Sequence, residues 1–140
     1  MDAFVQPLYE LADFDAIIRQ LKKPGIVQVS GCLDSQKAHF TNGLLREFPF
    51  RLIVAENDLK AKAFYEDFRL YDPEVLYYPA RDLIFYQADI HGNLLTRQRI
   101  QVLRALLERE EVTIVTSIDS CLDCLVPLAV WKEKVIKDSQ

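Results

Sequence analysis

The chain alternates short β-branched runs with stretches of helical periodicity, and this alternation limits the possible folds more than any other feature. The apolar runs cover residues 26–30, 51–55, 74–78 and 112–116. Since two parallel strands need a long crossover, which is usually a helix, strands that alternate with helices favour a parallel sheet. The sequence therefore predicts an α/β fold with a mainly parallel sheet flanked by helices.

Helical periodicity marks the segments around these runs. Amphipathic helices are expected over residues 8–21, 36–48, 96–110 and 117–125, and a further one after Asn57. Thr96 is expected to cap the third of these helices. The spacing of its apolar residues predicts that the inward face consists of Ile100, Leu103, Leu106 and Leu107.

The segment after the first run has the outline of a phosphate-binding loop, with Gly31 at its start and Lys37 in the place of the phosphate-binding lysine. Gln36 replaces a glycine that normally lets the backbone approach the phosphate, and Ala38 replaces the hydroxyl residue that holds Mg²⁺. Asp34 adds a negative charge that would repel a triphosphate. The chain also lacks an apolar strand that ends in the acidic pair of a Walker B motif. Of ATP hydrolysis, weak anion binding by Lys37 and a purely structural turn, the sequence favours the last.

The composition excludes several classes of protein. There are 17 Lys and Arg against 21 Asp and Glu, a net charge of -4, which argues against a stand-alone nucleic-acid binder. No stretch approaches the roughly 20 apolar residues of a membrane span, and no signal peptide is recognisable. An odd number of cysteines, Cys32, Cys121 and Cys124, is typical of a reducing compartment, so we expect a cytoplasmic protein. Cys121 and Cys124 have the spacing of half a zinc site, but without a second pair no metal site is predicted.

Charged residues in the second half of the chain offer a candidate interaction surface. Arg81 and Asp82 follow the third run, and Arg97 and Arg104 are seven residues apart and share a helix face. A contact with a partner or a nucleic acid is one interpretation, whereas a solvated face paired with neighbouring glutamates is the one that the spacing favours. Because ligands lie beyond the carboxyl ends of parallel strands, one shared edge is expected for residues 31–37, 56–57, 79–82 and Ser117.

The pattern divides the chain into three parts. Residues 1–23 are expected to form an N-terminal packing helix that covers a sheet edge, and residues 24–127 the α/β domain itself. Polar and apolar residues alternate from Trp131 to Lys137, as in the first strand of another unit. Residues 128–140 are therefore interpreted as the truncated start of a following domain.

Several segments occur in an order known from one family. The stretch LIVAENDLKAKAFYEDF, residues 52–68, resembles the strand and helix after the phosphate loop of superfamily 2 helicases. The segments that continue the order are residues 78–86, 99–107 and 112–118, with Pro127 closing the set. Over residues 8–137 this order is similar to the N-terminal module of bacterial transcription-repair coupling factors, itself similar to the first domain of excinuclease B. Excinuclease B has an intact phosphate loop and a tyrosine-rich hairpin, whereas residues 79–96 hold one tyrosine, Tyr86.

The resemblance implies a RecA-like, helicase-type fold and a scaffold with no catalytic residue and no cofactor of its own. Coupling factors recognise stalled RNA polymerase, displace it with a C-terminal ATP-driven DNA translocase and recruit excinuclease A for nucleotide excision repair. The expected partners are the remaining domains of the same protein, with excinuclease A, RNA polymerase and DNA reached through the full-length protein. The alternative is a fragment of an active superfamily 2 helicase-like ATPase such as excinuclease B.

Overall fold

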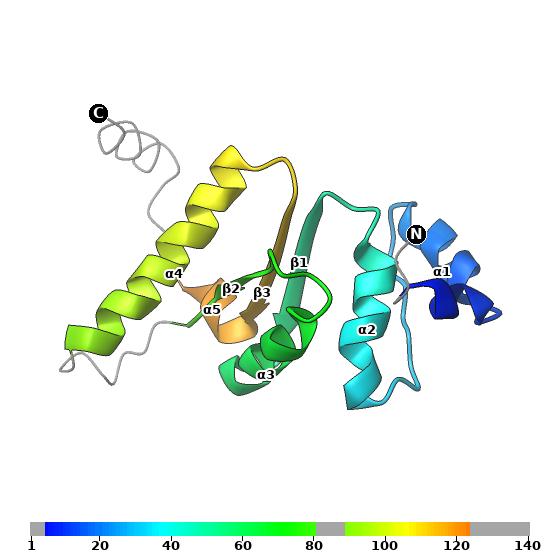
Figure 1. The fold of residues 1–140 in the computed structure, drawn as a ribbon, viewed down its shortest axis with the longest axis horizontal. Helices are drawn as coiled ribbons and strands as arrows, with labels where there is room; N and C mark the ends of the chain where they lie inside the picture. Colours follow the sequence, from blue (N-terminus) through cyan, green and yellow to red (C-terminus); the bar gives the residue numbers. More distant parts are fainter. Residues whose placement is uncertain (1–4, 81–88, 124–140) are drawn as a thin grey trace.

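The computed structural model describes residues 5–80 and 89–123, except for the side chains of residues 89–93. Its strands are β1 (Phe50–Ala55), β2 (Leu76–Tyr78) and β3 (Val112–Ser117). Its helices are α1 (Phe14–Leu21), α2 (Asp34–Leu45), α3 (Asp58–Phe68), α4 (Asp89–Glu108) and α5 (Ile118–Leu122), preceded by the short 3₁₀ helix η1 (Gln6–Glu10). Strands and helices alternate after α2 and the helices flank the sheet, so the predicted α/β class is confirmed (Figure 1).

The three strands form a parallel sheet in the order β1-β3-β2. Phe50 lies opposite Val112 at one end of the β1–β3 pair, and Tyr78 lies opposite Thr116 in the β2–β3 pair. Every residue of β3 is buried, because this strand has a neighbour on each side and helices above and below. The expected strands at 51–55, 74–78 and 112–116 are thus present, with shifts at their ends.

Each face of the sheet packs against one main helix. On one face, α3 and the start of α2 meet the sheet in a cluster built from Ala38, Ala61, Phe68, Val75 and Val115. On the other face, α4 contributes Val102 and Ala105 to a cluster with the strand residues Leu76, Tyr78, Val112 and Ile114. Burial of these apolar side chains is the main stabilising contribution to the domain.

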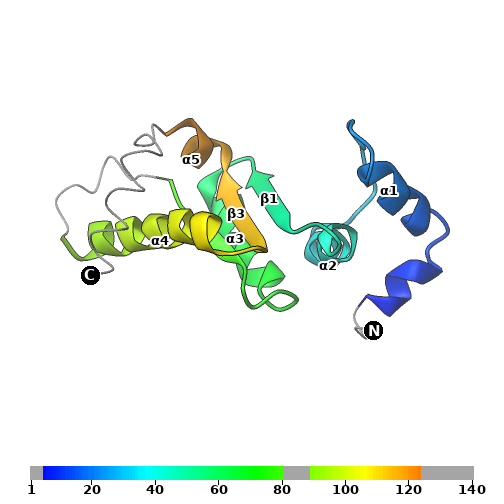
Figure 2. The same cartoon turned by 90° about the horizontal axis from the view of Figure 1, so that it is seen from above.

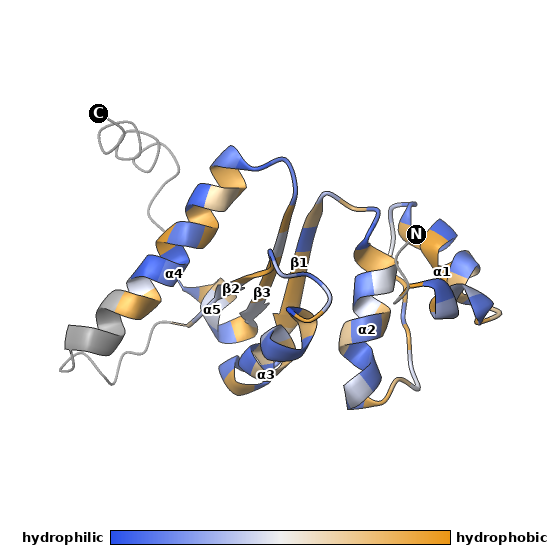
Figure 3. Cartoon of the chain, in the orientation of Figure 1, coloured by the Kyte–Doolittle hydropathy of each residue, from blue (hydrophilic) through white to orange (hydrophobic). Residues whose placement is uncertain are grey.

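The α4 face of the sheet is only partly covered. Phe50, Leu52 and Val54 of β1 lie in register with β3 residues beneath α4, yet each is at least 46% exposed. Helix α4 packs on β2 and β3. In the view from above, it lies beside β3, and β1 lies on the far side of β3 from this helix (Figure 2). The apolar residues of β1 also appear in orange in the hydropathy view (Figure 3).

The predicted strand at 26–30 is wrong. Residues 26–33 belong to no helix or strand, and Ile26 is 99% exposed. Both views place α2 between this segment and β1 (Figures 1 and 2). A strand forms only where its backbone N–H and C=O groups find a partner, and the helix separates the segment from the sheet edge. A RecA-like sheet with its first strand in place is therefore not what the described residues form.

The N-terminal segment also differs from expectation. Instead of one helix over 8–21, η1 and α1 are separated at residues 11–13, where Leu11 adopts an extended conformation. Both helices pack on α2 rather than on a sheet edge, through a cluster of Val5, Leu8, Phe14, Ile18 and Leu44. Gly43 makes the close approach possible, since a Cβ atom there would clash with Leu8 Cδ1 and lie 3.0 Å from Phe14 Cζ.

Helix α4 begins seven residues before the predicted cap, so Thr96 lies within it. Among its described side chains, those of residues 94–108, the buried ones are Arg99, Val102 and Ala105, whereas Ile100, Leu106 and Leu107 are exposed and Leu103 is half-buried. The predicted inward face was therefore wrong, because the helix is rotated about its axis by about one residue relative to the prediction. Within the described residues, no helix combines the length and apolarity needed to cross a membrane.

Candidate functional site

The carboxyl ends of all three strands meet at one edge of the sheet, and two helices begin there. Asn57 caps α3 by accepting a hydrogen bond from Lys60 N at 2.9 Å. Ser117 caps α5 in the same way, with its Oγ accepting from Ser120 N at 3.2 Å. Asn57 follows the end of β1 by two residues, and Ser117 is the last residue of β3. Each cap therefore determines where the helix after its strand begins.

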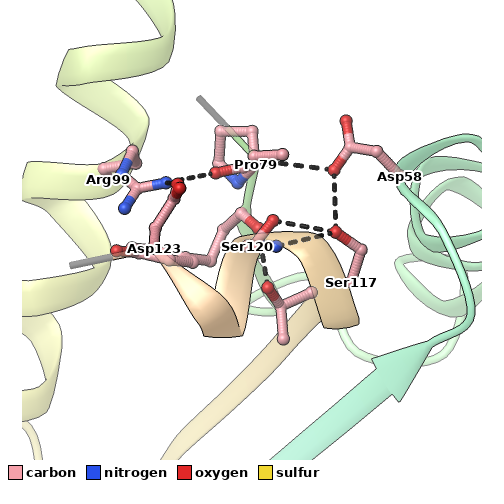
Figure 4. A network of polar contacts seen from close by, with 9 residues as sticks. Asp58, Pro79, Arg99, Ser117, Ser120 and Asp123 are labelled. Carbon is pink, nitrogen blue, oxygen red and sulfur yellow. Dashed lines mark hydrogen bonds and ion pairs between the residues drawn. The ribbon is translucent and has the colours of Figure 1, made fainter. Parts of the chain in front are cut away.

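Asp58 links the ends of all three strands. Its Oδ1 accepts hydrogen bonds from Ala80 N at 3.2 Å and from Ser117 Oγ at 3.4 Å (Figure 4). The hydroxyl of Ser117 also lies 2.9 Å from that of Ser120, and both serines are buried. The carboxylate thus connects the start of α3 with the segment after β2 and with the end of β3.

Arg99 of α4 makes the second set of contacts. Its Nη1 donates to Pro79 O at 2.8 Å and to Asp123 Oδ2 at 2.8 Å (Figure 4). Its guanidinium carbon lies 4.2 Å from the centre of the Tyr78 ring, within range of a cation–π interaction. A buried charge is tolerated only when it is paired and hydrogen-bonded, and these contacts meet that requirement in part.

The contacts close into one ring, because the backbone N–H of Asp123 donates to Ser120 O at 3.4 Å. We call this ring the carboxyl-edge network; its members are Asp58, Pro79, Ala80, Arg99, Ser117, Ser120 and Asp123. No member is a histidine or a cysteine. A serine beside an aspartate, without an imidazole between them, is not the Ser-His-Asp arrangement of a nucleophile and its base.

Tyr77 lies next to the network, and its hydroxyl donates to the backbone carbonyl of Asp58 at 3.4 Å. Burial is the largest cause that raises the pKa of Tyr77 above its ordinary value of 10.0, followed by the hydrogen bond to Asp58. The phenol therefore stays protonated and keeps its donor role over the whole physiological range.

The residues of the predicted phosphate loop have other partners. Lys37 Nζ lies 2.6 Å from Asp34 Oδ1, and this hydrogen bond and charge lower the pKa of Asp34. Gln36 Oε1 accepts from the backbone N–H of Leu33 at 3.4 Å, which helps to start α2. Ala38 is buried against α3. Gly31 has a φ of +87°, in the left-handed region that glycine adopts without strain.

The start of α2 lies near the start of α3, and the charge of Lys60 also lowers the pKa of Asp34. Lys60 is itself ion-paired with Glu56, whose hydrogen bond raises the pKa of the lysine. Lys37 and Lys60 are each paired with a carboxylate of the chain. An incoming anion would have to compete with those carboxylates.

The structure describes two of the four predicted interaction residues. Arg97 is exposed on α4, and Arg104 pairs with Glu108 at 2.8 Å, which confirms a solvated ion pair at that position. Arg81 and Asp82 lie outside the described residues. The sequence pattern placed Ser117 at this edge but did not identify Arg99, because arginine is a residue type that is seldom buried.

Metal binding finds no support in the part of the chain that the structure describes. Among the described side chains, those of residues 5–80 and 94–123, no cluster of three or more His, Cys, Asp or Glu residues could hold a metal ion. Cys121 is exposed and Cys32 is half-buried, and Cys124 lies outside the described residues. Among the described residues, no second pair of metal-binding side chains lies beside Cys121 to complete a zinc site.

A second charged region lies at the opposite edge, where the strands begin. A cavity of about 740 Å³ is lined there by Arg51, Asp72 and Glu74, among others. Arg51 lies 3.6 Å from Asp72, and Arg109 lies 3.3 Å from Glu74. The whole lining holds three arginines (Arg46, Arg51 and Arg109) and four carboxylates (Asp72, Glu74, Glu110 and Glu111), so most of its charge is compensated within the cavity.

Comparison of the chain with protein-family models, with curated proteins and with solved structures found no match. Neither a family nor a homologue therefore assigns an activity to the carboxyl-edge network or to the loop before α2.

Proposed function

We propose that this chain is a non-catalytic scaffold domain of a bacterial transcription-repair coupling factor. In that role it supports the recruitment of excinuclease A to stalled RNA polymerase during nucleotide excision repair. The ordered set of segments at residues 52–68, 78–86, 99–107 and 112–118 supports this proposal, together with the degenerate phosphate loop.

The observation that carries the proposal is the state of the loop. Lys37 is paired with Asp34 at 2.6 Å, and Ala38 is buried in the apolar cluster under α3. ATP binding of the phosphate-loop type needs a free lysine for the outer phosphates and a hydroxyl for Mg²⁺. With neither in place, the loop serves as the start of α2 and has no role in hydrolysis.

The carboxyl edge of the sheet supports the same proposal. This is the edge at which α/β sheets hold their ligands. Here the protein's own groups fill it, with Asp58 bonded to Ala80 and Ser117, and Arg99 bonded to Pro79 and Asp123. An edge bridged by its own side chains suits a rigid support for neighbouring domains.

The remaining domains of the same protein are the direct partners in this proposal. RNA polymerase, DNA and excinuclease A are contacted through the full-length protein, and the motor that uses ATP lies outside this chain. The domain needs no cofactor.

Calorimetric titration with ATP and Mg²⁺ tests the central claim. We expect no binding to the purified chain up to millimolar ATP. A matched variant with Asp34→Gly, Gln36→Gly and Ala38→Thr restores the residues of a working phosphate loop. Its titration shows whether the fold can still bind ATP at this position. Micromolar, Mg²⁺-dependent binding by the unaltered chain would refute the scaffold role and favour the active ATPase.

Recruitment is tested in the full-length protein. Arg99→Ala should loosen the scaffold domain, so that binding of excinuclease A falls while the DNA-dependent ATPase of the distant motor persists. Arg97→Ala, on the exposed side of the same helix, should leave both properties unchanged. Undiminished binding of excinuclease A by a protein whose scaffold domain is shown to be loosened would contradict the proposed support role.

A further inference from the structure

The carboxyl-edge network contains a charged group whose hydrogen bonding is incomplete. The side chain of Arg99 is only 7% exposed, and both of its hydrogen bonds in the network come from Nη1. Its Nη2 is buried and has no hydrogen-bond partner in the part of the chain that the structure describes. A buried donor without an acceptor is costly, so this half of the guanidinium is suited to a further oxygen.

The geometry of the guanidinium indicates which ligand would suit it. Its two terminal nitrogens form a planar fork that matches the two oxygens of a carboxylate. Asp123 contributes one oxygen, Oδ2, to Nη1 at 2.8 Å. An acceptor that reached Nη1 and Nη2 together would satisfy the buried charge more fully than the resident contact does.

The two partners differ in how easily they can move. Arg99 lies in the middle of the long helix α4, and its guanidinium group stacks on the Tyr78 ring. Asp123 is 25% exposed and follows the five-residue helix α5 as its C-cap. The carboxylate is therefore the exchangeable partner, and the arginine is the fixed one.

We propose that Arg99 forms a carboxylate-binding site at the carboxyl edge, in which Asp123 is the resident and replaceable ligand. The external ligand is a carboxylate, either on an acidic side chain or on a small free acid. The site reads the carboxylate by charge and by the bidentate geometry of Arg99, with Pro79 O fixing the orientation of the fork. This inference does not depend on the proposed scaffold function.

Chemical rescue tests the site. Asp123→Ala should lower the melting midpoint, and sodium formate should recover most of the loss at millimolar concentrations, beyond the effect of sodium chloride at the same ionic strength. Asp119→Ala is the matched control, because it removes an exposed carboxylate from the same short helix without touching Arg99. Its midpoint should respond to formate and to chloride alike.

A second readout does not depend on stability. The ¹⁵N–¹H resonances of the Arg99 side chain should shift on titration of Asp123→Ala or Asp123→Asn with formate, and should saturate. A blocked tripeptide with a central aspartate distinguishes the sources: binding of the peptide as well as formate indicates an acidic side chain, and binding of formate alone indicates a free acid. Equal responses of both variants to formate and chloride, with no saturable shift at Arg99, would overturn the proposal.

Discussion

The sheet half of the molecule, from β1 to α5, has a buried arginine pair in addition to exposed ion pairs, whereas the ion pairs described in the N-terminal half, from η1 to α2, are exposed. In the sheet half, Arg99 is buried and joins α4 to the ends of β2 and α5. In the N-terminal half, Lys37 pairs with Asp34 and Lys22 pairs with Glu47 at 2.5 Å, all on the surface. Exposed pairs contribute little to stability, whereas removing one partner of a buried pair is costly.

This difference indicates in which half the stability of the fold depends on particular charged residues. The N-terminal half is held by one apolar cluster, and its described ion pairs are exposed. The sheet half combines two apolar clusters with a polar network whose members depend on one another. The loop that resembles a nucleotide site lies in the half whose charges matter least.

The largest expected effect is at the buried arginine. Arg99→Ala should destabilise the chain by about 3–5 kcal/mol, because it removes one partner of a buried pair and leaves Pro79 O without its donor. Arg97→Ala, two residues earlier and exposed, should change the stability by less than about 0.5 kcal/mol. Urea unfolding followed by circular dichroism measures both, and similar losses in the two variants would contradict the contrast between buried and exposed charge.

The packing of the N-terminal half is broken by adding a single methyl group. Gly43→Ala would bring a Cβ atom into Leu8 and against Phe14, so a loss of roughly 1–3 kcal/mol is expected despite the better helix propensity of alanine. Ser35→Ala, on the exposed side of the same helix, should be neutral or slightly stabilising. If Gly43→Ala were as stable as the unaltered chain, η1 and α1 could not pack on α2 as closely as described.

The stability of the sheet half at alkaline pH is expected to depend on Tyr77. Because burial raises the pKa of Tyr77, the folded state keeps this proton at pH values where the unfolded state releases it. The associated stability is complete below pH 10.0, the ordinary value, and falls as the pH rises beyond it. Tyr77→Phe should flatten this part of the stability curve relative to the unaltered chain. Identical alkaline curves for Tyr77→Phe and the unaltered chain would argue against a buried phenol.

The smallest effect is expected in the loop. The pKa of Asp34 is lowered by Lys37, so its contribution is present above the ordinary value of 3.8 and is lost as the pH falls below it. Because the pair is exposed, acid unfolding of Asp34→Asn should coincide with that of the unaltered chain. A displaced acid transition would show that this surface pair contributes more than its exposure allows.

Local rules predicted much of the sheet half. Three β-branched runs became β1, β2 and β3, and Asn57 caps α3 as its position after a strand suggested. The same reasoning failed at residues 26–30, which have equally good strand composition. Composition reports how well a segment fits a sheet, but pairing requires a free neighbouring edge, and α2 lies between this segment and β1.

The candidate site was predicted only in outline. Ser117 was expected at the carboxyl edge and lies there, whereas its partner Asp58 was not among the predicted site residues. Arg99 was not among the predicted site residues, and Ile100, Leu106 and Leu107 were assigned inward positions that they do not have. The helix was correct, but its rotation about its axis was not, since several faces of α4 carry apolar residues.

The sequence by itself determined the class of the fold, the parallel strands and the degenerate character of the loop, because these depend on residue type and spacing along the chain. Only the tertiary structure decided which face of α4 is buried and that Arg99 meets Pro79 and Asp123. Arg99 is separated from those two partners by 20 and 24 residues. Contacts over such separations depend on how elements dock, and docking is fixed by the summed burial of many side chains rather than by any local pattern.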